Sequence, residues 1–167
     1  DARVEPYQAF FVQVQGEGVW CPDGHYYAEY FDNLNLAGTP VAAVCEPIAP
    51  DWQWHDCCSG MPPVLASHSS VFFSARWTSR VRTDVHEMKL FFASTASSGS
   101  RIVLDGTTVL DKWEECCSTF TSDLVTVGEG YHILNYEYRS APDQEASPTN
   151  SYAVLAYLTD SGTSAFG

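Results

Sequence analysis

Basic residues are scarce in this sequence of 167 residues. Lysine and arginine together number 8, against 21 aspartates and glutamates, and the formal net charge is −13 with histidine neutral. A field of this sign repels phosphate backbones and anionic lipids. The composition therefore argues against nucleic acid and against an anionic membrane surface as partners.

Several functional signals are also missing. No apolar run approaches the roughly 20 residues that a membrane-spanning helix needs, so we expect no membrane span. The sequence contains no Gly-x-Ser-x-Gly motif, and its five histidines do not have the spacing of metal ligands. A glycosidase pair of carboxylates could come only from acids such as Glu114, Glu115 and Glu129, and nothing places two of them across a cleft. We therefore expect that this chain is not an enzyme.

Six cysteines are present, and none of them forms a Cys-x-x-Cys pair. An even count in this arrangement indicates a disulfide framework formed in an oxidising compartment. A bond between neighbouring cysteines would close a strained small ring, so we discount bonds within Cys57-Cys58 and within Cys116-Cys117. The simplest pairing joins these two doublets by two bridges and leaves Cys21 with Cys45.

Zinc is the alternative use of the two cysteine doublets, with His55 as a further ligand. Adjacent ligands do not match the spacer of two to four residues that is usual in structural zinc sites. We therefore expect no metal there and predict that all six cysteines are oxidised.

Apolar and polar residues alternate with a period of two along much of the chain, and β-branched and aromatic residues are frequent, which is typical of β-strands. Asp105-Gly106 predicts a tight hairpin turn with Gly106 at positive φ, and Gly128-Glu129-Gly130 predicts another hairpin. The expected strands are Phe10–Val14, Tyr26–Phe31, Val71–Trp77, Met88–Ala93, Arg101–Leu104, Thr107–Leu110, Leu124–Val127, Tyr131–Tyr138 and Tyr152–Leu158.

Many short strands joined by closely spaced turns predict an all-β sandwich or barrel of antiparallel strands. Residues 38–63 are rich in proline and glycine, and we expect a long irregular segment there, fastened by cysteines. Its Trp52 and Trp54 are candidates for an exposed aromatic surface or for a plug at one end of the sandwich. The expected organisation is an N-terminal strand extension at 1–23, one sandwich domain at 24–159 and a Ser/Gly-rich tail at 160–167.

Five segments in order resemble the PA14 domain family. They are Tyr27-x-Glu29-Tyr30-Phe31, Phe73 to Thr78, Gly99 to Gly106, Val109 to Trp113, and Val127-x-x-Gly130-Tyr131-His132-Ile133 followed by Tyr136. PA14 domains are β-sandwiches of bacterial toxins, of glycosidase inserts and of fungal adhesins, in which they act as lectins. The resemblance implies a PA14-like β-sandwich that binds a partner and does not catalyse.

In the lectin branch of that family, two successive aspartates joined by a cis peptide bond hold calcium, and the calcium holds the sugar. The matching positions here are Ser97 and Ser98. Two neutral hydroxyls do not replace two anionic ligands, because strong calcium sites gather several carboxylate oxygens. We therefore expect no cofactor, and calcium in particular is disfavoured.

A second loop completes the family's sugar site, and it corresponds here to residues 139–150. Trp113 is the tryptophan of the Asp-x-Trp in the resemblance, Asp111-x-Trp113, and is a candidate for packing or for a sugar platform. Taken together, the candidate ligand-binding residues are Ser97, Ser98, Trp113, Arg139, Asp143, Gln144, Glu145 and Asn150.

The resemblance implies a secreted or cell-surface module for carbohydrate recognition and adhesion, with a glycan or a cell-surface glycoprotein as its partner. The alternative is a structural subunit of an extracellular assembly or fibre, joined to copies of itself through its N-terminal strand. In that case the alternating run Phe10–Val14 would add to the open sheet edge of a neighbour. The same run could also pair within its own chain.

Overall fold

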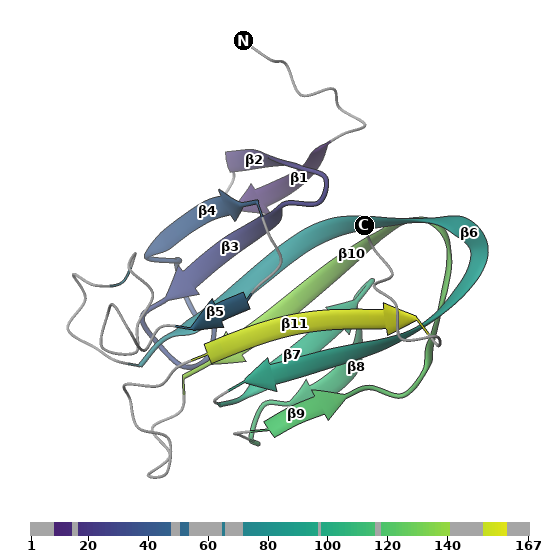
Figure 1. The fold of residues 1–167 in the computed structure, drawn as a ribbon. Coiled ribbons are helices and arrows are strands. Elements are labelled where there is room, and N and C mark those ends of the chain that lie inside the picture. The colour runs from purple at the N-terminus through teal and green to yellow at the C-terminus, as the bar shows by residue number, and fades with distance from the viewer. Residues whose placement is uncertain are drawn as a thin grey trace.

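The computed structural model describes residues 9–14, 17–47, 51–53, 65, 72–96, 98–115, 118–140 and 152–159. This part of the chain contains strands and no α-helix (Figure 1), and none of it is a helix long and apolar enough to cross a membrane. The strands are β1 (Ala9–Val14), β2 (Glu17–Pro22), β3 (Tyr26–Phe31), β4 (Ala42–Glu46), β5 (Asp51–Gln53), β6 (Ser74–Ala96), β7 (Ser100–Leu104), β8 (Thr107–Lys112), β9 (Ser118–Thr121), β10 (Val125–Arg139) and β11 (Tyr152–Thr159).

The fold is an antiparallel β-sandwich, as the sequence predicts, and β6 contributes to both of its layers. The first half of β6 lies between β3 and β10 in a layer with the order β4-β3-β6-β10-β7-β8. Its second half pairs with β11 and β9, and β5 lies beyond β11. Figure 1 shows β6 bending at one end of the molecule and returning beside β11.

The hairpin that we expected at Gly128-Glu129-Gly130 is wrong. These residues lie inside the continuous strand β10, where the register against β6 shifts between Gly128 and Gly130. Two closely spaced glycines are compatible with a turn and with a β-bulge. A bulge forms here because the residues before Gly128 and those after Gly130 pair with the same strand, β6. For the same reason Val71–Trp77 and Met88–Ala93 are not two separate strands, since most of both runs lies in β6.

The irregular segment expected at 38–63 is also partly wrong, because β4 and β5 form within it. Both are edge strands, β4 beside β3 and β5 beside β11. Edge strands have one unpaired side and a weak hydrophobic pattern. For this reason β4 and β5 could not be recognised in a segment rich in proline and glycine. Trp52 lies in β5, and Trp54 falls outside the described residues.

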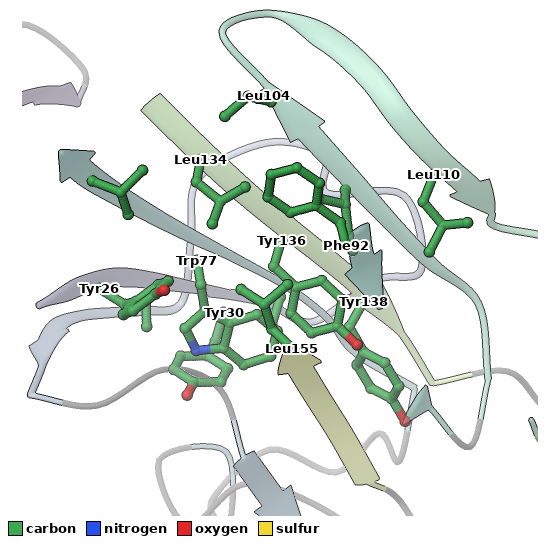
Figure 2. Close-up of a cluster of buried hydrophobic side chains, with 14 of the residues drawn as sticks. Tyr26, Tyr30, Trp77, Phe92, Leu104, Leu110, Leu134, Tyr136, Tyr138 and Leu155 are labelled. Atoms are coloured by element: carbon green, nitrogen blue, oxygen red, sulfur yellow. The ribbon is translucent and has the colours of Figure 1, made fainter. Parts of the chain in front are cut away.

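The main core lies between the two layers (Figure 2). Trp77 and Tyr136 come from one layer, and Phe92 and Leu155 come from the other. The rings of Trp77 and Tyr136 are stacked, with centroids 5.6 Å apart. Burial of such large aromatic side chains removes a large apolar area from water and so stabilises the core. The predicted inward alternation of the Phe73–Trp77 run is confirmed, because Phe73, Ala75 and Trp77 are all buried.

One buried carboxylate is built into this core. Glu46 accepts hydrogen bonds from the hydroxyl of Tyr30 at 2.6 Å and from Nε1 of Trp77 at 3.0 Å. Burial, together with the neighbouring Glu46 charge, raises the pKa of Tyr30 far above its usual value, so the phenol stays protonated and donates. The polar group is thus paired, as burial requires.

A disulfide joins Cys21 of β2 to Cys45 of β4, which confirms that part of the predicted pairing. It fastens a separate two-stranded sheet, β1-β2, onto the sandwich, with Phe10 and Tyr27 buried beneath. The run Phe10–Val14 therefore pairs with β2 of its own chain. The remaining predicted disulfide and zinc positions lie outside the described residues, namely Cys57, Cys58, Cys116, Cys117 and His55.

Candidate functional site

Trp113 and Arg139 come together beside the start of β7. Trp113 directly follows β8, and Arg139 is the last residue of β10. The backbone N–H of Arg139 donates to the carbonyl oxygen of Gly99 at 3.0 Å. A Cβ built on Gly99 would lie 2.1 Å from the carbonyl oxygen of Trp113 and 2.8 Å from Nε of Arg139. Only glycine at this position allows the three segments to approach so closely.

Among the other predicted binding residues, only Ser98 lies in the part of the chain that the structure describes. Ser98 is described and is buried, with 3% of its surface exposed. It therefore lies beneath the surface and cannot offer its hydroxyl to a large ligand without a rearrangement. The structure does not describe the rest of the predicted set, namely Ser97, Asp143, Gln144, Glu145 and Asn150.

Two guanidinium groups lie against the indole ring of Trp113. Cζ of Arg101 is 4.5 Å from the ring centroid, and Cζ of Arg139 is 5.5 Å from it. Both distances are within the range of cation–π attraction. Nη2 of Arg139 also donates to Oε2 of Glu114 at 2.7 Å. We call Arg101, Trp113, Glu114 and Arg139 the arginine–tryptophan cluster.

Arg139 is incompletely paired among the described residues. Its Nε is buried and has no hydrogen-bond partner in the part of the chain that the structure describes. Its ion-pair partner Glu114 is largely exposed, with 80% of its side chain accessible, whereas the Arg139 side chain is only 16% accessible. An ion pair with an exposed carboxylate holds the Arg139 guanidinium only weakly, because solvent competes for that carboxylate.

A row of alternating charges holds Arg101 in place. The carboxylate of Glu137 accepts from Nε of Arg101 at 2.8 Å and from Nε of Arg76 at 3.0 Å. Glu29 lies next along the row, 4.0 Å from Arg76. Burial raises the pKa of the Glu29 carboxyl; Arg76 opposes this shift and Glu137 adds to it. The row crosses four adjacent strands, β3, β6, β10 and β7, at directly opposite positions.

The cluster offers hydrogen-bond donors, one carboxylate and an aromatic ring, and these groups suit recognition of a polar ligand. Among the described residues no group of three or more His, Cys, Asp or Glu side chains could hold a metal ion. Of the three acids considered for a glycosidase pair, Glu114 pairs with Arg139 and Glu115 pairs with Lys112.

Sequence analysis missed the supporting arginines. Arg76 and Arg101 occupy outward positions of alternating strands, which the period-two pattern does show. Their convergence on Glu137 was not visible, because it depends on which strands are neighbours and on their register.

No protein-family model matches the chain, and no curated protein matches it. Solved structures similar to it include an anti-sigma factor domain-containing protein from Clostridium clariflavum, with a TM-score of 0.64 and 19% identity over 84% of this chain. Another is the PA14 sugar-binding domain from an RTX adhesin, with a TM-score of 0.58, 15% identity, and coverage of 87% of this chain and 95% of that one.

A third is β-glucosidase from Kluyveromyces marxianus, with a TM-score of 0.58 and 11% identity over 80% of this chain, although only 14% of the enzyme is covered. The chain also spans only 44% of the length of the anti-sigma factor domain-containing protein. At such identities the likeness concerns the fold alone. The β-sandwich of this chain is similar to the fold of PA14 domains, as well as to the matching part of these larger proteins.

Proposed function

We propose that this chain is a non-catalytic extracellular module that binds glycans, and that the arginine–tryptophan cluster takes part in the contact. The observation that carries the proposal is the arrangement of two guanidinium groups and one exposed carboxylate around the Trp113 ring. Aromatic faces pack on the C–H surface of a sugar ring, and guanidinium and carboxylate groups hydrogen-bond its hydroxyls.

Two further observations support the proposal. The disulfide Cys21–Cys45 is typical of proteins that fold in an oxidising compartment, which favours a secreted or cell-surface location. The fold is similar to that of a sugar-binding domain from an adhesin. The net charge of −13 disfavours strongly anionic ligands such as nucleic acid.

The pairing of Nη2 of Arg139 with an exposed carboxylate favours a ligand that supplies a competing acceptor. A hydroxyl or a carboxylate of a sugar could accept from the guanidinium and compete with the exposed Glu114. A bidentate contact to guanidinium is stronger and more directional than a contact to a neutral donor. We therefore expect Arg139 to contribute to affinity more than Glu114 does.

Binding to a printed array of neutral and acidic glycans, in calcium and again in excess chelator, tests the proposal. We expect selective binding of the wild-type protein that persists in chelator. The substitutions Arg139→Gln and Trp113→Ala should each weaken this binding about tenfold or more. Arg82→Gln is the matched control, because the described contacts join Arg82 to the exposed Asp84 and to the ring of Tyr131, and to no member of the arginine–tryptophan cluster. No binding to any glycan by the wild-type protein would refute the function, and loss of binding in chelator would restore a calcium mechanism.

The alternative of a fibre subunit joined through its N-terminal strand receives less support. Within the described residues that strand already pairs with β2. Sedimentation at several protein concentrations separates the two functions, since a fibre subunit would associate as concentration rises.

A further inference from the structure

The β1-β2 hairpin carries two aromatic side chains that the fold leaves uncovered. Phe11 is 53% exposed and Trp20 is 57% exposed, and these are the two highest values among the large apolar side chains in the described part of the chain. The two residues are directly opposite each other in the hairpin, and their ring centroids are 5.3 Å apart at a tilt of 58°. We call this pair the hairpin platform.

The platform is held in one geometry. A Cβ built on Gly18 would lie 1.9 Å from Cε2 of Phe11, so the Phe11 ring occupies the space over Gly18 and cannot do so over any larger residue. This is the packing of an aromatic ring over a cross-strand glycine. On the opposite face of the hairpin, Phe10 is buried against Tyr27 and the Cys21–Cys45 bridge ties β2 to β4. Two rings fixed in advance lose little entropy when a ligand binds.

The size of the platform favours a small ligand over a protein. An aromatic side chain presents roughly 150–250 Å² in all, so two half-exposed rings offer on the order of 200 Å². A stable protein interface needs about 800 Å² from each partner. Two copies of this chain would in addition bring together two bodies of charge −13. The platform therefore does not by itself suit self-association.

The charge around the platform decides the class of the small ligand. Glu17 is the one charged residue of β1 and β2, and its strand position lies on the opposite face of the hairpin from Gly18 and Trp20, because successive strand positions alternate between faces. Asp23, the residue that follows β2, forms a bidentate ion pair with Arg80, at 2.8 and 2.9 Å. Within β1 and β2 this face therefore offers neither a cation to an anionic ligand nor a carboxylate to a cationic ligand. An uncharged ligand with one apolar face fits.

We propose that the hairpin platform is a second binding site, for the pyranose rings of a neutral glycan, distinct from the arginine–tryptophan cluster. The rings of Phe11 and Trp20 contact the C–H face of the sugar, and its hydroxyls remain in water. The inference rests on the proposed glycan-binding function for its ligand class, and it assigns that class to residues outside the main sandwich.

Affinity electrophoresis in native gels tests this site with three neutral probes (laminarin, yeast mannan and hydroxyethylcellulose) and one anionic probe, alginate. We expect at least one neutral probe to retard the wild-type protein and alginate not to. Trp20→Ala and Phe11→Ala should each weaken the retardation about tenfold. Tyr131→Ala is the control, because Tyr131 is an exposed aromatic residue that lies under the guanidinium of Arg80 instead.

Gly18→Ala gives a second test that keeps both aromatic side chains. The added methyl must push the Phe11 ring aside, so we expect weaker retardation with an unchanged melting temperature of the sandwich. Far-UV circular dichroism of every variant confirms that it is folded. If Gly18→Ala is retarded as strongly as the wild-type protein, the two rings bind the probe without a fixed geometry, and the proposal is overturned.

The outcomes separate this inference from the proposed function. If Trp113→Ala abolishes binding to the neutral probes and Trp20→Ala does not, the platform is not a site and the glycan-binding function stands. If Trp20→Ala abolishes binding and Trp113→Ala does not, the platform is the site and the cluster is not. Retardation by no neutral probe, or association of the wild-type protein that Trp20→Ala abolishes in sedimentation, would overturn the inference.

Discussion

Asp105 and Gly106 form the tip of the β7-β8 hairpin in the left-handed region, with φ of 48° and 79°. This confirms the tight turn and the positive φ that Asp105-Gly106 predicted. Asp105 tolerates the conformation because its carboxylate accepts from the backbone N–H of Ile133 at 2.8 Å. Gly106 tolerates it because it has no Cβ.

Gly106→Val should destabilise the protein by roughly 1–2 kcal/mol, because a β-branched residue resists the left-handed conformation. The space around Gly106 is open, so the cost is in the backbone and not in a clash. Gly128→Val is the control, since Gly128 also faces open space but does not have a positive φ. Urea unfolding measures both, and equal stability of the two variants would contradict the explanation.

His132 has an acceptor at each ring nitrogen. Nδ1 is 2.6 Å from Oδ2 of Asp105, and Nε2 is 2.7 Å from the carbonyl oxygen of Gly128. Burial lowers the pKa of His132, but the hydrogen bonds to Asp105 and Gly128 raise it, and the net shift is upward. Only the imidazolium form can donate to both acceptors.

A raised folded-state pKa gives stability that is fully present below the unfolded value of about 6.5 and is lost as the pH rises through the folded value. His132→Gln should therefore cost about 1 kcal/mol at acidic pH and less at alkaline pH. Urea unfolding of both proteins at pH 5.5 and pH 9 measures this difference, and Asp105→Asn should reduce it. An equal cost at both pH values would show that the contact does not require the protonated ring.

At the scale of elements, the charged row across β3, β6, β10 and β7 ties four strands together on the outer face of one layer. Its central member, Glu137, is buried, with 6% of its surface exposed. Removing one partner of a buried ion pair costs more than the pair itself contributes, because the other charge is left without compensation. The stability of this layer therefore depends on the single carboxylate of Glu137.

Glu137→Ala should destabilise by about 2 kcal/mol, which is below the usual cost for a fully buried pair because Arg76 and Arg101 remain about one-third exposed. Asp84→Ala removes an exposed partner of Arg82 and should change stability by less than about 0.5 kcal/mol. Thermal unfolding followed by circular dichroism gives both values. A Glu137→Ala protein as stable as Asp84→Ala would mean that the row contributes little.

At the scale of the whole molecule, the stability of the fold depends on a disulfide as well as on the packed core. The bridge between Cys21 and Cys45 closes a separation of 24 residues. On the chain-entropy estimate a loop of this length stabilises by roughly 3 kcal/mol. It holds the β1-β2 hairpin, and with it the hairpin platform, on the sandwich.

The predicted bridges between the two cysteine doublets give a test on the whole chain. Mass spectrometry of the non-reduced protein should show all six cysteines oxidised, with a peptide that joins the segment containing Cys57-Cys58 to the segment containing Cys116-Cys117. Four free thiols, or stoichiometric zinc, would favour the metal site. Cleavage of the Cys21–Cys45 bridge alone should loosen the hairpin first, since among the described strands β1 and β2 are hydrogen-bonded only to each other.

The amino-acid sequence determined the local features by itself. The alternation around Trp77, the turn at Asp105-Gly106 and the partnership of Cys21 with Cys45 were predicted and are confirmed. Each of them depends on short-range preferences: a period of two, a left-handed backbone or the elimination of strained bonds. The antiparallel β-sandwich follows from the repetition of such signals.

Only the tertiary structure decided how these local features combine. Gly128 and Gly130 became a bulge because β6 pairs with the chain on both sides of them. The guanidinium of Arg101 reached Glu137 because β7 and β10 are neighbours in register, and Phe11 met Trp20 through a hairpin that the sequence had not indicated. The physical reason is that each strand pairs with whichever strand edge gives the most favourable hydrogen bonds and packing in the whole fold. A sequence pattern shows only the conformation that each segment prefers by itself.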